Sequence, residues 1–136
     1  MKEAINTLQL ILTAIGGYIG YFLGGFDGLI YALVAFVVID YITGLMAAVI
    51  EKRLSSGIGF RGIFKKVLIF TLVGIGHIID FHLIEKGSAV RTAVIFFYLS
   101  NEGLSIMENA AKVGLPIPEK LQIVFTELRR EEGKND

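Results

Sequence analysis

The sequence predicts an all-α, polytopic membrane protein with about four transmembrane helices and a short, cytoplasmic, amphipathic C-terminal helix. Of the 136 residues, 54% are apolar and only 19% are charged, which is a lower charge content than a typical soluble domain has. The apolar residues form runs close to the roughly 20 that a helix needs to cross a bilayer. Basic residues gather between these runs, as in cytoplasmic loops of membrane proteins. We expect a single membrane domain over residues 1–136.

The first three spans follow from the apolar runs. Residues 4–26 contain no charge. This run is too long for the core of a removed signal peptide and lacks an obvious cleavage site after it, so we expect a retained span. Residues 28–50 contain one charged residue, Asp40. Residues 67–84 form the third span and follow a basic segment.

The fourth span, residues 89–108, depends on charge asymmetry as well as hydropathy. It contains Glu102, and a re-entrant or surface helix is the alternative. Four spans place eleven of the thirteen Lys and Arg residues on one side of the membrane. Three spans would place the basic tail outside, against the positive-inside rule. We therefore expect four spans with both termini in the cytoplasm.

The segment between the second and third spans is predicted to be a basic loop with glycines on the cytoplasmic side. Its composition suits contact with anionic headgroups, and simple topology-fixing charge is the alternative. The expected headgroup contacts are Lys52, Arg53, Arg61, Lys65 and Lys66.

Polar residues on the apolar helices mark candidate contacts inside the membrane. Asp40 and Gly44 share one helical face of the second span, where small residues let another helix approach closely. The third span places His77 and Asp80 on one face. Counted from the shared loop, Asp40 and His77 lie at a similar depth of about 15 Å. We therefore expect His77 to pair with Asp40; an unpaired Asp40, kept neutral by burial, is the alternative.

The fourth segment is predicted to be an amphipathic helix at membrane depth. Polar residues recur along it in steps of three and four, so this stripe must face protein or water. The stripe includes Asn101, Glu102, Ser105 and Glu108. The alternative is that these groups satisfy one another inside a static bundle.

Glycines at four-residue steps form a ridge on the first span. They are Gly16, Gly20 and Gly24, and such ridges let helices pack by backbone contact. The partner is a second copy or a helix of the same protomer. Because one small protomer can seclude few polar faces, we expect a homo-oligomer.

The tail, residues 112–136, is expected to contain a short cytoplasmic helix. Leu121, Val124, Phe125 and Leu128 fall on one stripe, and Pro118 suits the first turn. This helix is expected to pack on a partner or on the membrane surface.

The sequence contains no convincing catalytic, metal or cofactor motif. It has no cysteine, and His77 with Asp80 is too sparse for a metal site. Ser100 or Ser105 with His77 is the one alternative for an enzyme, an intramembrane hydrolase. The basic loop lacks the aromatic residues expected of a nucleic-acid surface, so no nucleic-acid partner is expected.

Four segments of the chain together resemble the toxin secretion/phage lysis holins, small membrane proteins of Gram-positive bacteria and their phages. The segments are "DYITG" from Asp40, "LSSGIGFRGIFKK" ending at Lys66, "HIID" from His77, and "SNEGLSIMENAAKVGLPIPEKL" from Ser100. They occur in the order of the family, and the combination is specific although each piece alone is not.

The resemblance implies a protein that accumulates in the bacterial cytoplasmic membrane and suddenly forms large lesions. These lesions release a cell-wall hydrolase or a toxin as cargo. Asp40 is then kept for assembly or switching, and the polar stripe of the fourth segment lines the opening. The alternatives are a small ion-coupled transporter and a structural membrane adaptor or antiholin.

Overall fold

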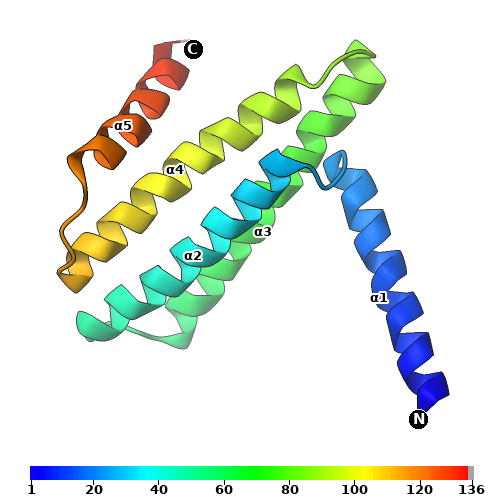
Figure 1. Ribbon diagram of the computed structural model, residues 1–136, viewed down its shortest axis with the longest axis horizontal. Coiled ribbons are helices and arrows are strands. Elements are labelled where there is room, and N and C mark those ends of the chain that lie inside the picture. The colour runs from blue at the N-terminus through cyan, green and yellow to red at the C-terminus, as the bar shows by residue number, and fades with distance from the viewer. Residues whose placement is uncertain (135–136) are drawn as a thin grey trace.

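The computed structural model describes residues 1–134, which form helices joined by short connections (Figure 1). No strand occurs within these residues, so the all-helical prediction is confirmed. The helices are α1 (Lys2–Leu23), α2 (Gly28–Ile50), α3 (Ser56–Ile78), α4 (Ala89–Val113) and α5 (Glu119–Lys134). A π-helical turn, η1 (Ile79–Ile84), continues α3.

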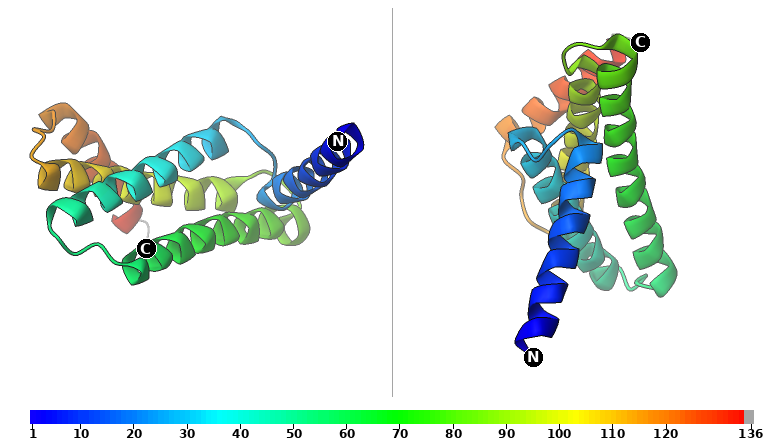
Figure 2. Two further views of the ribbon diagram at one scale, coloured as in Figure 1. Left: turned by 90° about the horizontal axis from the view of Figure 1, so that it is seen from below. Right: turned by 90° about the vertical axis from the view of Figure 1, so that its right-hand side faces the viewer.

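Helices α2, α3 and α4 form the bundle, and α2 and α4 share its most extensive contact (Figure 1). Helix α1 diverges from this bundle and contacts α3 near its own C-terminal end (Figure 2). Helix α5 turns back along α4. Helix α1 is thus the loosely attached element, whereas α5 packs along α4.

The apolar core lies between the bundle helices and the end of α1. Its buried members are Leu23, Ile30, Leu33, Val37, Ile69, Val73, Ile95 and Leu99. Most side chains of α1 and the outer faces of α2 and α3 are exposed and apolar. In lipid such surfaces need no cover, because helix association there depends on close packing and polar contacts.

Capping residues set the helix boundaries. The Asp27 carboxylate accepts a hydrogen bond from the Ile30 amide at 3.0 Å and starts α2. The Ser55 hydroxyl accepts one from the Ile58 amide at 3.2 Å and starts α3. The prediction of a loop as far as Lys66 is therefore wrong, because the helix begins eleven residues before the expected start of the third span.

Three helical segments are long and apolar enough to cross a membrane: α1, α2 and residues Ser56–Ile84. Helix α4 is not among them. It carries Arg91, Glu102, Glu108 and Lys112 along its length, and its expected crossing as a fourth span stays a prediction.

Candidate functional site

Three charged side chains from three helices meet at one level of the bundle. Asp40 lies ten residues before the end of α2, and Lys66 lies ten residues after the start of α3. Glu102 lies eleven residues before the end of α4. At about 1.5 Å per residue, all three lie roughly 15 Å from the same end of the bundle.

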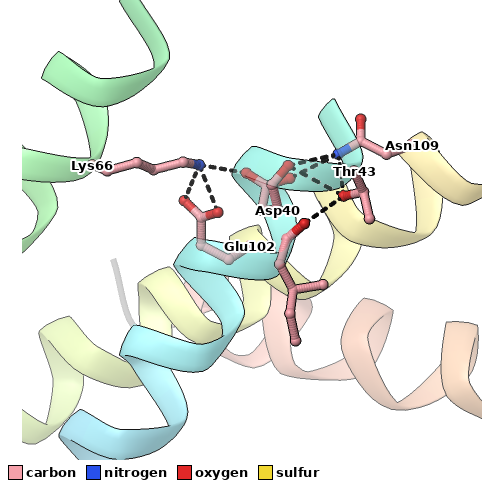
Figure 3. A network of polar contacts seen from close by, with 6 residues as sticks. Asp40, Thr43, Lys66, Glu102 and Asn109 are labelled. Atoms are coloured by element: carbon pink, nitrogen blue, oxygen red, sulfur yellow. Dashed lines mark hydrogen bonds and ion pairs between the residues drawn. The ribbon is translucent and has the colours of Figure 1, made fainter. Parts of the chain in front are cut away.

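The Lys66 ammonium joins the two carboxylates (Figure 3). Its Nζ donates to Glu102 Oε1 and Oε2 at 2.9 and 2.7 Å, and it forms an ion pair with Asp40 Oδ2. The side chains of Asp40 and Glu102 are 8% and 7% exposed. One ammonium therefore serves two secluded carboxylates, which ties together α2, α3 and α4.

Asn109 completes this group from the next turns of α4. Its Nδ2 donates to Asp40 Oδ1 at 3.0 Å, to the Asp40 main-chain oxygen at 3.2 Å and to Thr43 Oγ1 at 3.0 Å (Figure 3). The Thr43 hydroxyl in turn donates to the Ile39 carbonyl at 2.7 Å. We call Asp40, Lys66, Glu102 and Asn109 the Lys66 cluster.

A hollow of about 290 Å³ opens beside the Lys66 cluster. Ser105 and Gly44 line it, together with Arg53 from the connection between α2 and α3. A Cβ added at Gly44 would lie 3.6 Å from Asn109 Nδ2, in ordinary contact. The hollow connects the cluster with the end of the bundle where α3 begins.

The expected pairing of Asp40 with His77 is wrong, since Asp40 bonds to Lys66 and Asn109 instead. The depth of His77 was counted from residue 67, but α3 begins at Ser56. His77 therefore lies about three turns beyond Lys66 along α3. It sits beside Gly24 at the other end of the bundle, where a Cβ on this glycine would approach His77 Nδ1 to 2.7 Å.

A second charged group, the Arg91 cluster of Arg91, Asp27 and Asp80, occupies that other end. Arg91 Nε donates to the Leu23 carbonyl at 2.6 Å, and Nη1 donates to Asp27 Oδ2 at 2.8 Å. Asp80, almost fully buried, accepts from the main-chain amides of Val90 and Arg91 at 3.0 and 2.8 Å. These contacts fasten the end of α1 and the start of α2 to the start of α4.

Charge pairing also shifts the titration of Asp27, which lies between α1 and α2. The hydrogen bond from Arg91 lowers the pKa of the Asp27 carboxyl below its ordinary value, against the opposing effect of burial. Asp27 thus stays ionised and keeps its bond to the guanidinium.

The five basic residues expected at lipid headgroups divide into two groups. Lys66 faces the two carboxylates inside the bundle, and its side chain is 18% exposed. The other four, Lys52, Arg53, Arg61 and Lys65, are exposed, and their contact with headgroups stays a prediction. The hydrogen bond from Arg53 lowers the pKa of Glu51, which follows the end of α2.

The predicted polar stripe of α4 divides between two sides. Glu102 and Asn109 bond within the Lys66 cluster, and Ser105 lines the adjacent hollow. Glu108 instead lines a pocket between α4 and α5. Asn101 is half-buried. Two faces of α4 are therefore polar, where the sequence predicted one.

The predicted glycine ridge on α1 does not form a single packing face within the protomer. No other residue lies within 4 Å of a Cβ placed at Gly16, whereas one at Gly20 would meet the Phe26 ring at 2.6 Å. Gly24 follows the helix and caps it at a φ of +87°, a conformation that favours glycine. Contact between copies through Gly16 and Gly20 stays a prediction.

Sequence reasoning missed Arg91, Asp27 and the role of Lys66. The signal for Lys66 was present, because Gly59, Gly62 and Lys66 continue the helical period of the buried Ile69 upstream. Asp27 directly before an apolar run fits an N-cap. No sequence signal identified Arg91 as the partner of Asp27.

Within the described residues, no group of three or more His, Asp or Glu side chains is placed to hold a metal ion. The Lys66 cluster offers charge pairing across helices. An arrangement of this kind holds helices together and can exchange partners when the helices move.

Comparison with known proteins gives one family and several relatives. The model described as the bacteriophage holin family matches residues 17–130. An uncharacterized protein of Listeria innocua is 44% identical over 115 residues, covering 85% of this chain and 81% of the relative. A probable holin of Bacillus phage phi105 is 33% identical over 103 residues, covering 73% of this chain and 76% of the phage protein. No solved structure matches the chain.

Proposed function

This chain belongs to the bacteriophage holin family, and on that premise we propose that it forms timed lesions in the bacterial cytoplasmic membrane. Copies accumulate there, assemble, and at a threshold open a path that releases a cell-wall hydrolase or a toxin. The cargo need not bind the chain. We also propose four spans with both termini in the cytoplasm, because this arrangement keeps ten of the thirteen basic residues on one side, with Lys66 inside the bundle.

The observation that carries this proposal is the Lys66 cluster. It places Asp40, Lys66 and Glu102 between helices, largely hidden from the surroundings. Charged groups inside a membrane are costly and usually serve a function. A closed protomer satisfies them internally and lets the membrane stay sealed. When helices separate, the same groups become available to water or to another copy.

We propose that the polar residues of α4 line the opened path. Glu102 and Ser105 already face the hollow and the cluster, and both would be costly against lipid. Asn101 and Glu108 remain candidates on neighbouring faces of the same helix. In cells, a cysteine at Ser105 is expected to react with a membrane-impermeant thiol reagent after lysis begins. A cysteine at the apolar Phe97 is the control, and equal reactivity of the two contradicts the assignment.

The test of function is controlled overproduction with a membrane-potential dye and a reporter for enzyme release. We expect a silent delay, then abrupt depolarisation followed by release. Asp40→Leu is expected to insert normally but to change or abolish the delay, whereas Val38→Leu on an exposed position keeps it. An unchanged delay for Asp40→Leu at normal protein levels contradicts the role of the cluster.

The same experiment separates the alternatives. A graded ion leak without enzyme release favours a small ion-coupled transporter. Overproduction without harm favours a structural adaptor, and a lengthened delay in a strain with an active holin favours an antiholin.

A further inference from the structure

Helix α5 covers the side of α4 that faces away from α3 and the Lys66 cluster. It packs against Gly103, which is buried. A Cβ added at Gly103 would lie 2.5 Å from Cε1 of the Phe125 ring, and its three nearest neighbours would all be atoms of that ring. The Phe125 ring also meets Phe36 of α2 edge-on at 5.8 Å. Phe125 thus sits in a notch formed by α2 and α4.

This notch lies deep along the bundle. Gly103 is ten residues from the end of α4, about 15 Å, and it follows Glu102 of the Lys66 cluster directly. Next to it, a pocket between α4 and α5 is lined by Glu108 of α4 and by Gln122 and Thr126 of α5. Helix α5 therefore covers Gly103, and the carboxylate of Glu108 lies exposed at the edge of the same contact.

The exposed surface of α5 contains charged side chains beside the apolar Leu121, Ile123 and Val124. Lys120, Glu127 and Arg130 are exposed, and the nearest ion pair among them is a loose 3.8 Å contact between the last two. Such a surface belongs in water or among headgroups. Helix α4 therefore cannot be surrounded by lipid at the level of Gly103 while α5 is docked there.

We propose that α5 is a detachable cover that controls assembly. While Phe125 occupies the notch at Gly103, the outer face of α4 is closed to other copies. Release of α5 opens this face, and a second copy of the chain packs there. A helix fits this position better than lipid, because Gly103 allows close approach and Glu108 requires a polar partner. This inference deepens the proposed function and rests on it.

Helix α5 can be cross-linked to α4 through introduced cysteines, because the chain has no cysteine of its own to react. In the full-length protein carrying Ala111→Cys and Gln122→Cys, which line the pocket between α4 and α5 and leave Gly103 and Phe125 in place, a short, cleavable bifunctional thiol reagent should bridge the two helices. We expect the bridged protein to remain unassembled in vesicles and to release no trapped enzyme. Cleaving the bridge should restore both. The two single-cysteine variants, treated identically, are the controls.

The outcomes separate this inference from the proposed function. If bridged and cleaved protein assemble equally, the cover is refuted. If the cleaved protein assembles but releases nothing, the cover stands and the lesion-forming function fails. Assembly is followed by amine cross-linking, which does not depend on release.

A second variant tests the cover without cross-linking. Phe125→Ala should shift the docked fraction by about tenfold towards the open state and shorten the delay before release in cells. Ile123→Ala truncates a side chain that is 53% exposed on the same helix and should keep the delay. An equal change for both variants, or none for Phe125→Ala, contradicts the proposal.

Discussion

The two charged clusters of the bundle satisfy their polar groups in different ways. The Arg91 cluster lies at helix ends, where main-chain groups have no partner within their helix. Arg91 bonds to the Leu23 carbonyl, and Asp80 bonds to two amides at the start of α4. The Lys66 cluster lies in mid-helix, where the main chain is already paired. Its charged side chains depend mainly on one another.

This difference distinguishes charges that hold the helices in one arrangement from charges that can change partners. Charges at helix ends stay bound as long as the helices exist. Mid-helix charges lose their partners as soon as the helices move apart, and they then need new ones. On α4 the clusters are eleven residues apart, about 16 Å, compared with about 30 Å for a hydrocarbon core. The apolar layer between the clusters is thus thin.

The largest expected effect comes from removing the shared cation. Lys66→Met leaves the carboxylates of Asp40 and Glu102 secluded without a counter-charge. Breaking a buried ion pair in this way costs about 3–5 kcal/mol. We expect a matching loss of unfolding free energy, measured by denaturation in detergent micelles.

The matched control is Lys65→Met, which removes an exposed charge from the neighbouring position. A smaller loss is expected when Glu102→Gln accompanies Lys66→Met, because one carboxylate then disappears. Equal stability of the Lys65 and Lys66 variants would show that the cluster does not hold the helices together.

The sequence predicted the fold class better than the contacts between helices. The resemblance to holins, the helical class and the apolar run of α2 are confirmed, because composition and periodicity are local properties. The partner of Asp40 was wrong because it depends on the register between helices. That register follows from the cap at Ser55, which starts α3 eleven residues upstream of the apolar run.

The charge of Lys66 is the reason why its position was predicted wrongly from the sequence. A lysine after Arg61 and Lys65 indicates a cytoplasmic loop under the positive-inside rule. Helical spacing from Gly59 and Gly62 places it on the inner face instead. Arg91 was missed because two of its four side-chain hydrogen bonds reach main-chain carbonyls, which no side-chain motif identifies, and the other two reach Asp27, which is distant in the sequence.

A smaller loss of stability is expected from a substitution in the Arg91 cluster. Arg91→Met removes the bonds to the Leu23 carbonyl and to Asp27, and a hydrogen bond to a charged group contributes about 1.5–3 kcal/mol. Because helix ends keep other contacts, α1 should loosen while α2, α3 and α4 stay packed. Spin labels on cysteines at Leu10 and Phe64 measure this as a broader distance distribution. Lys86→Met, an exposed change nearby, should leave the distribution narrow.

The smallest expected effect is the pH dependence of the bond between Asp27 and Arg91. The pKa of Asp27 is lowered in the folded chain, chiefly by the hydrogen bond from Arg91. Its contribution to stability is therefore complete above the ordinary value of about 3.9 and is lost as the pH falls through the lower folded pKa. The Asp27 side chain is 47% exposed, so solvent screening limits this contribution to less than about 1 kcal/mol.

Asp27→Asn removes this titration while keeping a side chain that can cap α2. We expect the wild type to exceed the variant in unfolding free energy at pH 6, and the difference to shrink on acidification to pH 3. A constant difference across this range would mean that Asp27 acts through its cap on α2 alone. The Arg91 cluster would then be held by its main-chain contacts, in sharper contrast to the Lys66 cluster.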